Sequence, residues 1–234
     1  MVSDLDEVSR VRTSDADKRI YKAIFDAVRS QQLRPGTKLT ENSLSELFGV
    51  SRTIVRKALQ KLAHEHIVEL RPNRGAAIAS PSRQETSEVF TARRAIEAAI
   101  LPLVVDNATK AQLVKLKQHA RREHQAFECG DRPTWIRLTG EFHLMLGDIG
   151  GNRVLSRYLS ELVSRCSLII ALYDSSSSVP CDNDEHDHLI DLIATQDTQE
   201  LVRMMDRHLL GIEQRLDLST DSSGVNLAQI LKIS

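Results

Sequence analysis

Apolar residues recur with a helical period through almost all of residues 84–216, and this pattern constrains the fold more than any other feature. It predicts six helices, at about 84–105, 109–129, 132–149, 152–173, 182–195 and 197–216. Thr109 and Gln112 form a capping-box sequence, and Pro133 stands in a predicted first turn. Because the loops between these helices are short, neighbouring helices should run antiparallel. The region is therefore expected to fold as an antiparallel all-helical bundle.

A different pattern precedes the bundle, because residues 17–78 predict three helices and then a hairpin. The helices are expected from Asp17 to the turn at 34–36, from about Glu41 to Phe48, and from a Ser51 cap to about His64. Alternating residues at 67–70 and 76–78 predict two strands around a turn at 71–75. Three helices followed by a hairpin is the order of a winged helix-turn-helix.

The chain should thus be mainly α, with an N-terminal winged helix-turn-helix and a C-terminal helical bundle. We expect a flexible polar arm at 1–14, the DNA-binding domain at 15–79, the bundle at 80–218 and a polar tail at 219–234. Residues 1–80 carry a net charge of +4 and the remaining residues carry −5. A basic head on an acidic body suits a protein whose N-terminal part binds DNA.

Several sequence features favour a cytoplasmic protein that has no membrane partner. No apolar run is long enough to span a bilayer, and the polar, acidic start does not resemble a signal peptide. The three cysteines, Cys129, Cys166 and Cys181, form no CxxC pair and are expected to be reduced thiols.

The first turn of the third predicted helix and the hairpin carry the side chains expected to contact DNA. These residues are Ser51, Arg52, Thr53, Ile54, Arg56, Arg71 and Arg74. Arg52 can donate two hydrogen bonds to O6 and N7 of a guanine, whereas Thr53 and Arg56 can contact bases or phosphates. The hairpin arginines can reach phosphates or a minor groove. The alternative is that these basic side chains only keep exposed surfaces solvated.

Residues 33–59 resemble the DNA-binding head of the GntR family of bacterial regulators, which reads PG-x-x-L-x-E and then L-x-x-x-x-GVSR-x-x-VR-x-AL. The likeness extends over about residues 17–78. It implies base contacts for Arg52 and Arg56 and wing contacts near Gly75. The sequence departs from the family at His66, where a glycine usually ends the helix, and at Asn42, where a basic residue is common.

Three of the eight histidines lie on the apolar faces of three predicted bundle helices. They are His143, His186 and His208. Neutral imidazoles from facing helices can converge on Zn²⁺, Ni²⁺ or a similar divalent metal and leave coordination positions open for a ligand. The alternative for each residue is a core histidine that makes an ordinary hydrogen bond.

These histidines also follow the order and spacing of the FCD domain, the C-terminal domain of the FadR subfamily of GntR regulators. The resemblance covers residues 84–216 and implies a small carboxylate effector, often bound through a metal, with Asn152 as a pocket residue. Many such domains hold the metal with an additional aspartate four residues before the first histidine. Thr139 occupies that position here, so the site has three histidine ligands at most. Without a metal, the histidines would bind an anionic ligand directly.

Arg93 lies on the apolar stripe of its helix with Val89 and Ile100. A buried arginine must be paired, because an isolated charge is costly away from water. The partner can be an effector carboxylate, bound through two hydrogen bonds, or Glu97 one turn away. Asn152 also has two readings, because it can line the effector pocket or cap a helix.

Together these features predict a homodimeric transcriptional regulator of double-stranded DNA with a pseudo-palindromic operator. The resemblance makes it a repressor whose affinity for the operator changes when a small organic acid binds the helical domain. Two alternatives remain, namely an architectural DNA-binding protein without an effector and a metal-dependent hydrolase built on the histidines. Because the chain has no HExxH motif or nucleophile elbow, we do not expect an enzyme.

Overall fold

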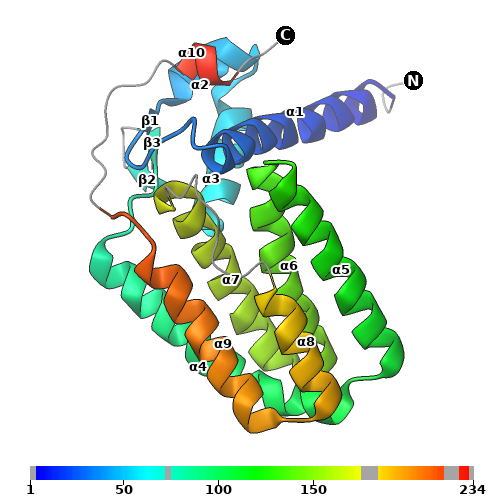
Figure 1. Cartoon of the computed structure of the whole chain (residues 1–234). Helices are drawn as coiled ribbons and strands as arrows, with labels where there is room; N and C mark the ends of the chain where they lie inside the picture. The colour runs from blue at the N-terminus through cyan, green and yellow to red at the C-terminus, as the bar shows by residue number, and fades with distance from the viewer. Residues whose placement is uncertain (1–3, 72–74, 175–183, 219–226, 232–234) are drawn as a thin grey trace. The chain divides into compact units, whose positions relative to one another are not determined.

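The computed structural model describes residues 4–71, 75–174, 184–218 and 227–231 (Figure 1). The chain divides into two compact units between Ser80 and Pro81. The first unit comprises Met1–Ser80 with Asp221–Ser234, and the second comprises Pro81–Thr220. Among the described helices, none is long and apolar enough to cross a membrane.

The first unit contains helices packed beside a small antiparallel sheet. Its elements are α1 (Asp4–Arg29), β1 (Lys38–Leu39), α2 (Glu41–Phe48), α3 (Arg52–His64), β2 (Val68–Arg71), β3 (Gly75–Ile78) and α10 (Leu227–Ile230). The strand order is β1-β3-β2, so β3 pairs with a strand on each side. This arrangement confirms the winged helix-turn-helix and adds β1, which the sequence patterns did not predict.

Helix α1 begins at Asp4, well before the start expected near Asp17. The expected arm at 1–14 is therefore helical from its fourth residue onward. The apolar period that guided the prediction fades toward the N-terminus, but no proline or glycine precedes Pro35 to stop a helix. Within the polar tail expected at 219–234, the short helix α10 lies inside residues 225–233, where the sequence pattern allows one helix.

Two of the left-handed backbone positions in the turns of the first unit bear on the sequence predictions. His66 has φ of 58°, so this histidine does adopt the conformation that a glycine usually takes after the third helix. Gly75 has φ of 82°, and a Cβ atom there would lie 2.6 Å from the backbone oxygen of Leu39. A glycine is therefore required where β3 passes close to β1.

The second unit is a bundle of helices, and the six predicted helices are confirmed with their ends shifted by at most three residues. They are α4 (Arg83–Asn107), α5 (Lys110–Glu128), α6 (Arg132–Gly150), α7 (Arg153–Tyr173), α8 (Glu185–Thr195) and α9 (Thr198–Gln214). Helix α4 packs against α6, α7 and α9, while α5 packs against α6 and α8 (Figure 1). Inward-facing residues of α4, α6, α8 and α9 therefore meet inside one bundle.

Glycines allow α6 to lie close to α7. A Cβ atom at Gly140 would approach Ser167 Oγ to 3.1 Å, and one at Gly147 would approach Leu159 Cδ2 to 3.1 Å. Both glycines are buried. The close packing fixes the position of α6, which carries the first of the three inward histidines.

Candidate metal centre and DNA-facing helix

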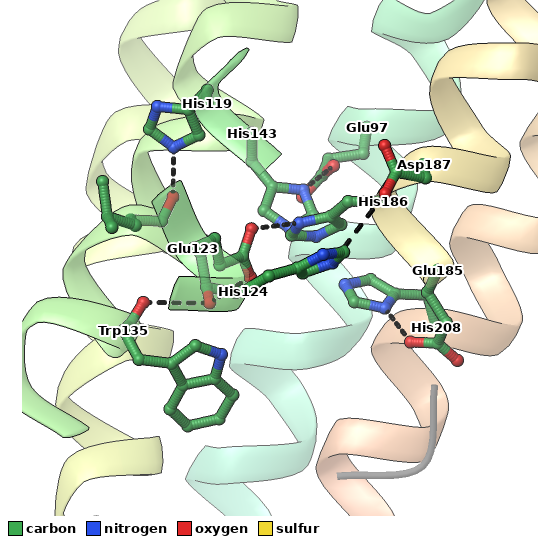
Figure 2. Close-up of polar contacts among 12 residues, drawn as sticks. Glu97, His119, Glu123, His124, Trp135, His143, Glu185, His186, Asp187 and His208 are labelled. Atoms are coloured by element: carbon green, nitrogen blue, oxygen red, sulfur yellow. Dashed lines mark hydrogen bonds and ion pairs between the residues drawn. The ribbon is translucent and has the colours of Figure 1, made fainter. Parts of the chain in front are cut away.

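The three predicted histidines meet in the interior of the bundle. His143 on α6, His186 on α8 and His208 on α9 are all buried, and one ring nitrogen from each lies within 4.8 Å of those of the other two. The Nε2 atom of each ring is buried and has no hydrogen-bond partner among the described residues. Figure 2 shows the three rings pointing toward a common centre.

Each histidine binds a different glutamate through its other ring nitrogen. Nδ1 lies 2.7 Å from Glu97 Oε2 for His143, 2.7 Å from Glu123 Oε2 for His186, and 2.5 Å from Glu185 Oε2 for His208. An ionised carboxylate accepts hydrogen bonds, so the Nδ1 of each ring carries the hydrogen. The lone pair then lies on Nε2, toward the centre of the cluster. Metal-binding histidines in proteins commonly have this carboxylate partner.

The electrostatic environment keeps His143 neutral. Burial and the nearby positive charge of Arg93 lower the pKa of His143 to about 3, although Glu97 acts in the opposite direction. Burial also lowers the pKa of His208. Neutral imidazoles have a free lone pair at pH 7, which metal coordination requires.

The glutamates stay ionised despite their burial. Desolvation acts to raise the pKa of Glu97, but His143 and Arg93 outweigh it and bring the pKa to about 2. The pKa of Glu123 is also about 2, because hydrogen bonds from His186 and Thr139 outweigh the effect of desolvation. Three imidazole rings, each oriented by a carboxylate, therefore fit a divalent metal such as zinc or nickel.

Arg93 is buried, and its Nε donates a hydrogen bond to Glu97 Oε1 over 2.7 Å. The internal ion pair considered from the sequence is therefore present. The Nη2 atom of Arg93 is also buried, with no hydrogen-bond partner among the described residues. The guanidinium thus orients Glu97 and retains a donor for a further acceptor.

A cavity of about 50 Å³ adjoins the histidines. The residues that line it are Arg93, Arg215, Thr139, Ser167, His186, His208, Trp135, Ile136, Gly140, Ile170, Asp174, Ile212, Glu123 and Glu185. Its walls therefore combine two arginines, two hydroxyl groups and the edge of the histidine cluster with three carboxylates. The arginines and hydroxyl groups can donate hydrogen bonds to a small anion, whereas the carboxylates repel one.

The two other predicted effector residues have different positions. Thr139 lines the cavity, and its hydroxyl lies 2.7 Å from Glu123 Oε1 and 3.0 Å from the backbone oxygen of Trp135. Asn152 is exposed and is not among the residues that line the cavity. Its side chain accepts hydrogen bonds from the backbone of Val154 and Leu155, so it caps α7.

Sequence reasoning did not assign a role to Glu123. It lies on a heavily charged helix, and nothing in the local pattern shows that one of these charges faces inward. The same helix carries His119, which is also buried and lies 2.7 Å, through Nε2, from the backbone oxygen of Leu138. The inward position of both residues can be recognised only once α5 is placed against α6.

A second group of potential ligands, His124, Asp184 and Asp187, lies near the edge of α5 and α8. His124 Nε2 is 3.9 Å from a carboxylate oxygen of Asp187 (Figure 2). Asp184 is exposed. Among the described residues, none of these three side chains has a buried nitrogen or oxygen atom that lacks a hydrogen-bond partner. This group is therefore a surface ion pair, unlike the buried histidine cluster.

The residues predicted to contact DNA cluster at the start of α3. Ser51 occupies the N-cap position but makes no side-chain capping bond, contrary to our expectation. Arg52, Thr53 and Arg56 are exposed, whereas Ile54 is half-buried. The guanidinium of Arg56 donates two hydrogen bonds to Glu41, of 2.9 and 2.8 Å. This surface therefore presents hydroxyl and guanidinium donors at a helix N-terminus, which suits contacts with a nucleic acid.

The hairpin residues are partly described. Arg71 is exposed at the end of β2, and Gly75 begins β3. Arg74 lies outside the described residues, so its predicted contact stays a prediction.

Comparison with known sequences finds two matching families. Residues 16–78 match the family of bacterial regulatory proteins called gntR, and residues 88–211 match the FCD domain. The chain is 30% identical over 200 residues to the Uxu operon regulator of Haemophilus influenzae, covering 77% of this chain and 74% of that protein. It is 25% identical over 203 residues to the HTH-type transcriptional repressor RspR of Escherichia coli, covering 86% and 89%.

Solved structures with the same fold include Escherichia coli McbR/YncC, with a TM-score of 0.68 and 20% identity over 86% of this chain and 94% of that chain. A transcriptional regulator GntR from Rhodococcus sp. RHA1 has a TM-score of 0.71 and 19% identity over 85% and 96%. At these identities the structures support the fold of the chain.

Proposed function

The chain belongs to the GntR family of bacterial transcriptional regulators and carries an FCD domain, and on this premise we propose that it is an effector-controlled repressor. Its family and relatives are transcriptional regulators and not enzymes, which sets the hydrolase alternative aside. We propose that the repressor acts in the cytoplasm as a homodimer on a pseudo-palindromic operator. A single head of this size makes few base contacts, so two heads would supply the specificity.

The observation that carries the effector proposal is the set of three buried Nε2 atoms that face one another and have no hydrogen-bond partner in the described part of the chain. His143, His186 and His208 would hold a divalent metal, which supplies a positive charge and open coordination positions for a carboxylate. The orienting glutamates, Glu97, Glu123 and Glu185, would keep the three lone pairs directed at it.

The cavity beside the histidines supports a small organic acid as the effector. Arg93 and Arg215 line the cavity, and the unpartnered Nη2 of Arg93 can donate to a carboxylate. Ser167 adds a hydroxyl group that can donate to a further oxygen atom of the ligand, and the hydroxyl oxygen of Thr139 can accept a hydrogen bond from a ligand hydroxyl. The volume of about 50 Å³ favours an acid of only a few non-hydrogen atoms.

We propose that the start of α3 reads the operator in the major groove. Arg52, Thr53 and Arg56 would contact bases and phosphates, Ser51 and Ile54 would flank them, and Arg71, Arg74 and Gly75 would form the wing contact. The exposure of Arg52, Thr53 and Arg56 supports this role. Glu41 would hold the Arg56 guanidinium in one orientation until DNA binds.

The metal proposal is tested by elemental analysis of the purified protein and of the variants His143→Ala, His186→Ala and His208→Ala. We expect about one zinc or nickel ion per chain, lost in each variant. His188→Ala is the matched control, because His188 is exposed on the same helix as His186. If the wild-type protein took up neither ion after incubation, the proposed metal site would be excluded. If, in addition, no small acid changed DNA affinity, the architectural alternative would stand.

A further inference from the structure

Glu123 differs from the other two histidine partners in how its second carboxylate oxygen is held. The second oxygen of Glu97 accepts a hydrogen bond from Arg93, and Glu185 is partly exposed, with 27% of its side chain accessible. Glu123 is buried, and its second oxygen lies 2.7 Å from the hydroxyl of Thr139. Among the hydrogen bonds of the described residues, Glu123 is thus the one of these three glutamates that accepts from a hydroxyl group of the cavity wall.

The hydroxyl group of Thr139 donates a stronger hydrogen bond to Glu123 than it would donate to the backbone oxygen of Trp135. Thr139 has one hydrogen to donate and lies near both Glu123 Oε1 and the backbone oxygen of Trp135. The carboxylate is ionised and is the closer acceptor, so it forms the stronger bond. A continuous row of hydrogen bonds therefore runs from Thr139 through Glu123 to Nδ1 of His186.

Phe142 restricts the same imidazole from another side. The rings of Phe142 and His186 are stacked, with their centroids 3.9 Å apart and their planes 15° from parallel. Stacking limits the plane of the imidazole but does not distinguish its two orientations related by a flip about the Cβ–Cγ bond. The bond from Nδ1 to Glu123 selects one of these orientations, and with it the position of Nε2.

We propose that Glu123 is a positioning residue of the metal centre, held by Thr139, and that this pair is incompatible with a carboxylate at position 139. The inference rests on the proposed metal site and adds two residues that control it. A carboxylate at 139 would stand against the buried carboxylate of Glu123, and two close carboxylates repel each other. With Thr139 in place, the three imidazoles would be the protein ligands of the metal, and no carboxylate of the chain would coordinate it at position 139.

The pair also has a possible purely structural role, since the Thr139–Glu123 bond joins α6 to α5. A structural role would change thermal stability and leave the affinity for a metal intact. A positioning role changes the affinity for the metal and the geometry around it. The two roles are therefore separated by measuring metal binding and stability on the same variants.

The experiment is a titration of the full-length, metal-free protein with Co²⁺ in a chelator buffer, followed by visible absorption, with melting temperatures recorded in parallel. Glu123→Gln should weaken Co²⁺ binding by about 10- to 100-fold, because an orienting carboxylate typically contributes that much. Thr139→Val should weaken it by a smaller factor, and Thr139→Ser should restore it. Glu128→Gln, an exposed change on the same helix, is the matched control and should bind like the wild type.

Thr139→Asp tests the incompatibility directly. Alone, it should bind Co²⁺ no more tightly than the wild type, because the new carboxylate faces Glu123. Combined with Glu123→Gln, it should bind more tightly than Glu123→Gln alone and alter the absorption spectrum, since a fourth protein ligand becomes available.

Two results would overturn the inference while leaving the metal site itself intact. One is a Co²⁺ affinity of Glu123→Gln equal to that of the wild type. The other is a Thr139→Asp single variant that binds Co²⁺ more tightly than the wild type. A wild-type protein that binds no Co²⁺ would overturn the metal proposal, and this inference would fall with it.

Discussion

The histidine cluster illustrates how burial and hydrogen bonding act on individual residues. An exposed histidine takes up a proton near neutral pH, whereas burial and Arg93 hold His143 in its neutral form. Its partner Glu97 remains charged because two donors point at it. The same surroundings thus keep a base neutral and an acid ionised, which is the combination that a metal centre needs.

This pattern predicts how the stability of the metal-free protein depends on pH. The pKa of His143 is 6.5 without perturbation and about 3 in the folded protein, so the unfolded chain binds its proton first as the pH falls. Stability attributable to His143 is therefore complete above about pH 6.5 and is lost progressively toward pH 3. Melting temperatures measured by circular dichroism with a chelator, from about pH 7.5 to about pH 4.5, should decrease. His143→Gln should show a shallower decrease; an equal slope would contradict the assignment to His143.

Among the elements, the close approach of β1 and β3 depends on one glycine. Gly75→Ala should destabilise the protein by about 1–3 kcal/mol or more, because a left-handed residue gains a Cβ that meets the Leu39 carbonyl. Gly49→Ala is the matched control, since Gly49 is also left-handed but has nothing within 4 Å of the added atom. That variant should lose only about 1 kcal/mol. Both free energies of unfolding are measured with urea. Equal losses in the two variants would show that the contact with Leu39 does not contribute to the destabilisation.

The recognition helix α3 gives a second prediction at this scale. Arg52→Ala should weaken binding to an operator, selected from random duplex DNA, by about 1–3 kcal/mol and relax the preference for one base pair. Lys22→Ala, an exposed change on α1, should have a small effect. Fluorescence anisotropy at fixed salt measures both. If Arg52→Ala weakened all sequences equally, Arg52 would be a phosphate contact and not a base contact.

Local patterns predicted most elements, but they did not predict contacts between distant segments. The bundle helices were found because each has its own apolar period and capping residues, as at Thr109. Strand β1 has only two residues and exists because it pairs with β3, so no local pattern marks it. The inward histidines were found from their own stripes, whereas Glu123 required the packing of α5 against α6.

For the whole molecule, the proposed function requires that a ligand in the cavity would act on the DNA-binding unit. Ile170 and Asp174 line the cavity, and Arg132 binds the backbone oxygens of both residues. Between them, the Tyr173 hydroxyl donates to the backbone oxygen of Pro81 over 3.2 Å. Pro81 is the first residue of the second unit. The end of α7 thus connects the cavity wall to the start of the chain segment that leads to the DNA-binding unit.

Tyr173→Phe tests this connection, because it removes the hydroxyl and keeps the ring. The variant should bind Co²⁺ like the wild type but show a reduced effect of Co²⁺ on operator affinity. Tyr158→Phe is the control, since Tyr158 is exposed on the same helix. Co²⁺ titrations and anisotropy with and without Co²⁺ provide the comparison. If Co²⁺ changed operator affinity equally in Tyr173→Phe and the wild type, the connection through Pro81 would be excluded.

Under the proposed metal binding, the three inward nitrogens would also affect how much of the regulator a cell retains. Each buried acceptor without a donor costs about 1–3 kcal/mol, a large fraction of the stability of a typical domain. An ion at 100 times its dissociation constant would return about 2.7 kcal/mol by mass action. Chains made during metal scarcity would therefore unfold more often and be degraded faster by proteases. Metal supply would then control the number of repressor molecules, and genes with weak operators would be released before those with strong ones.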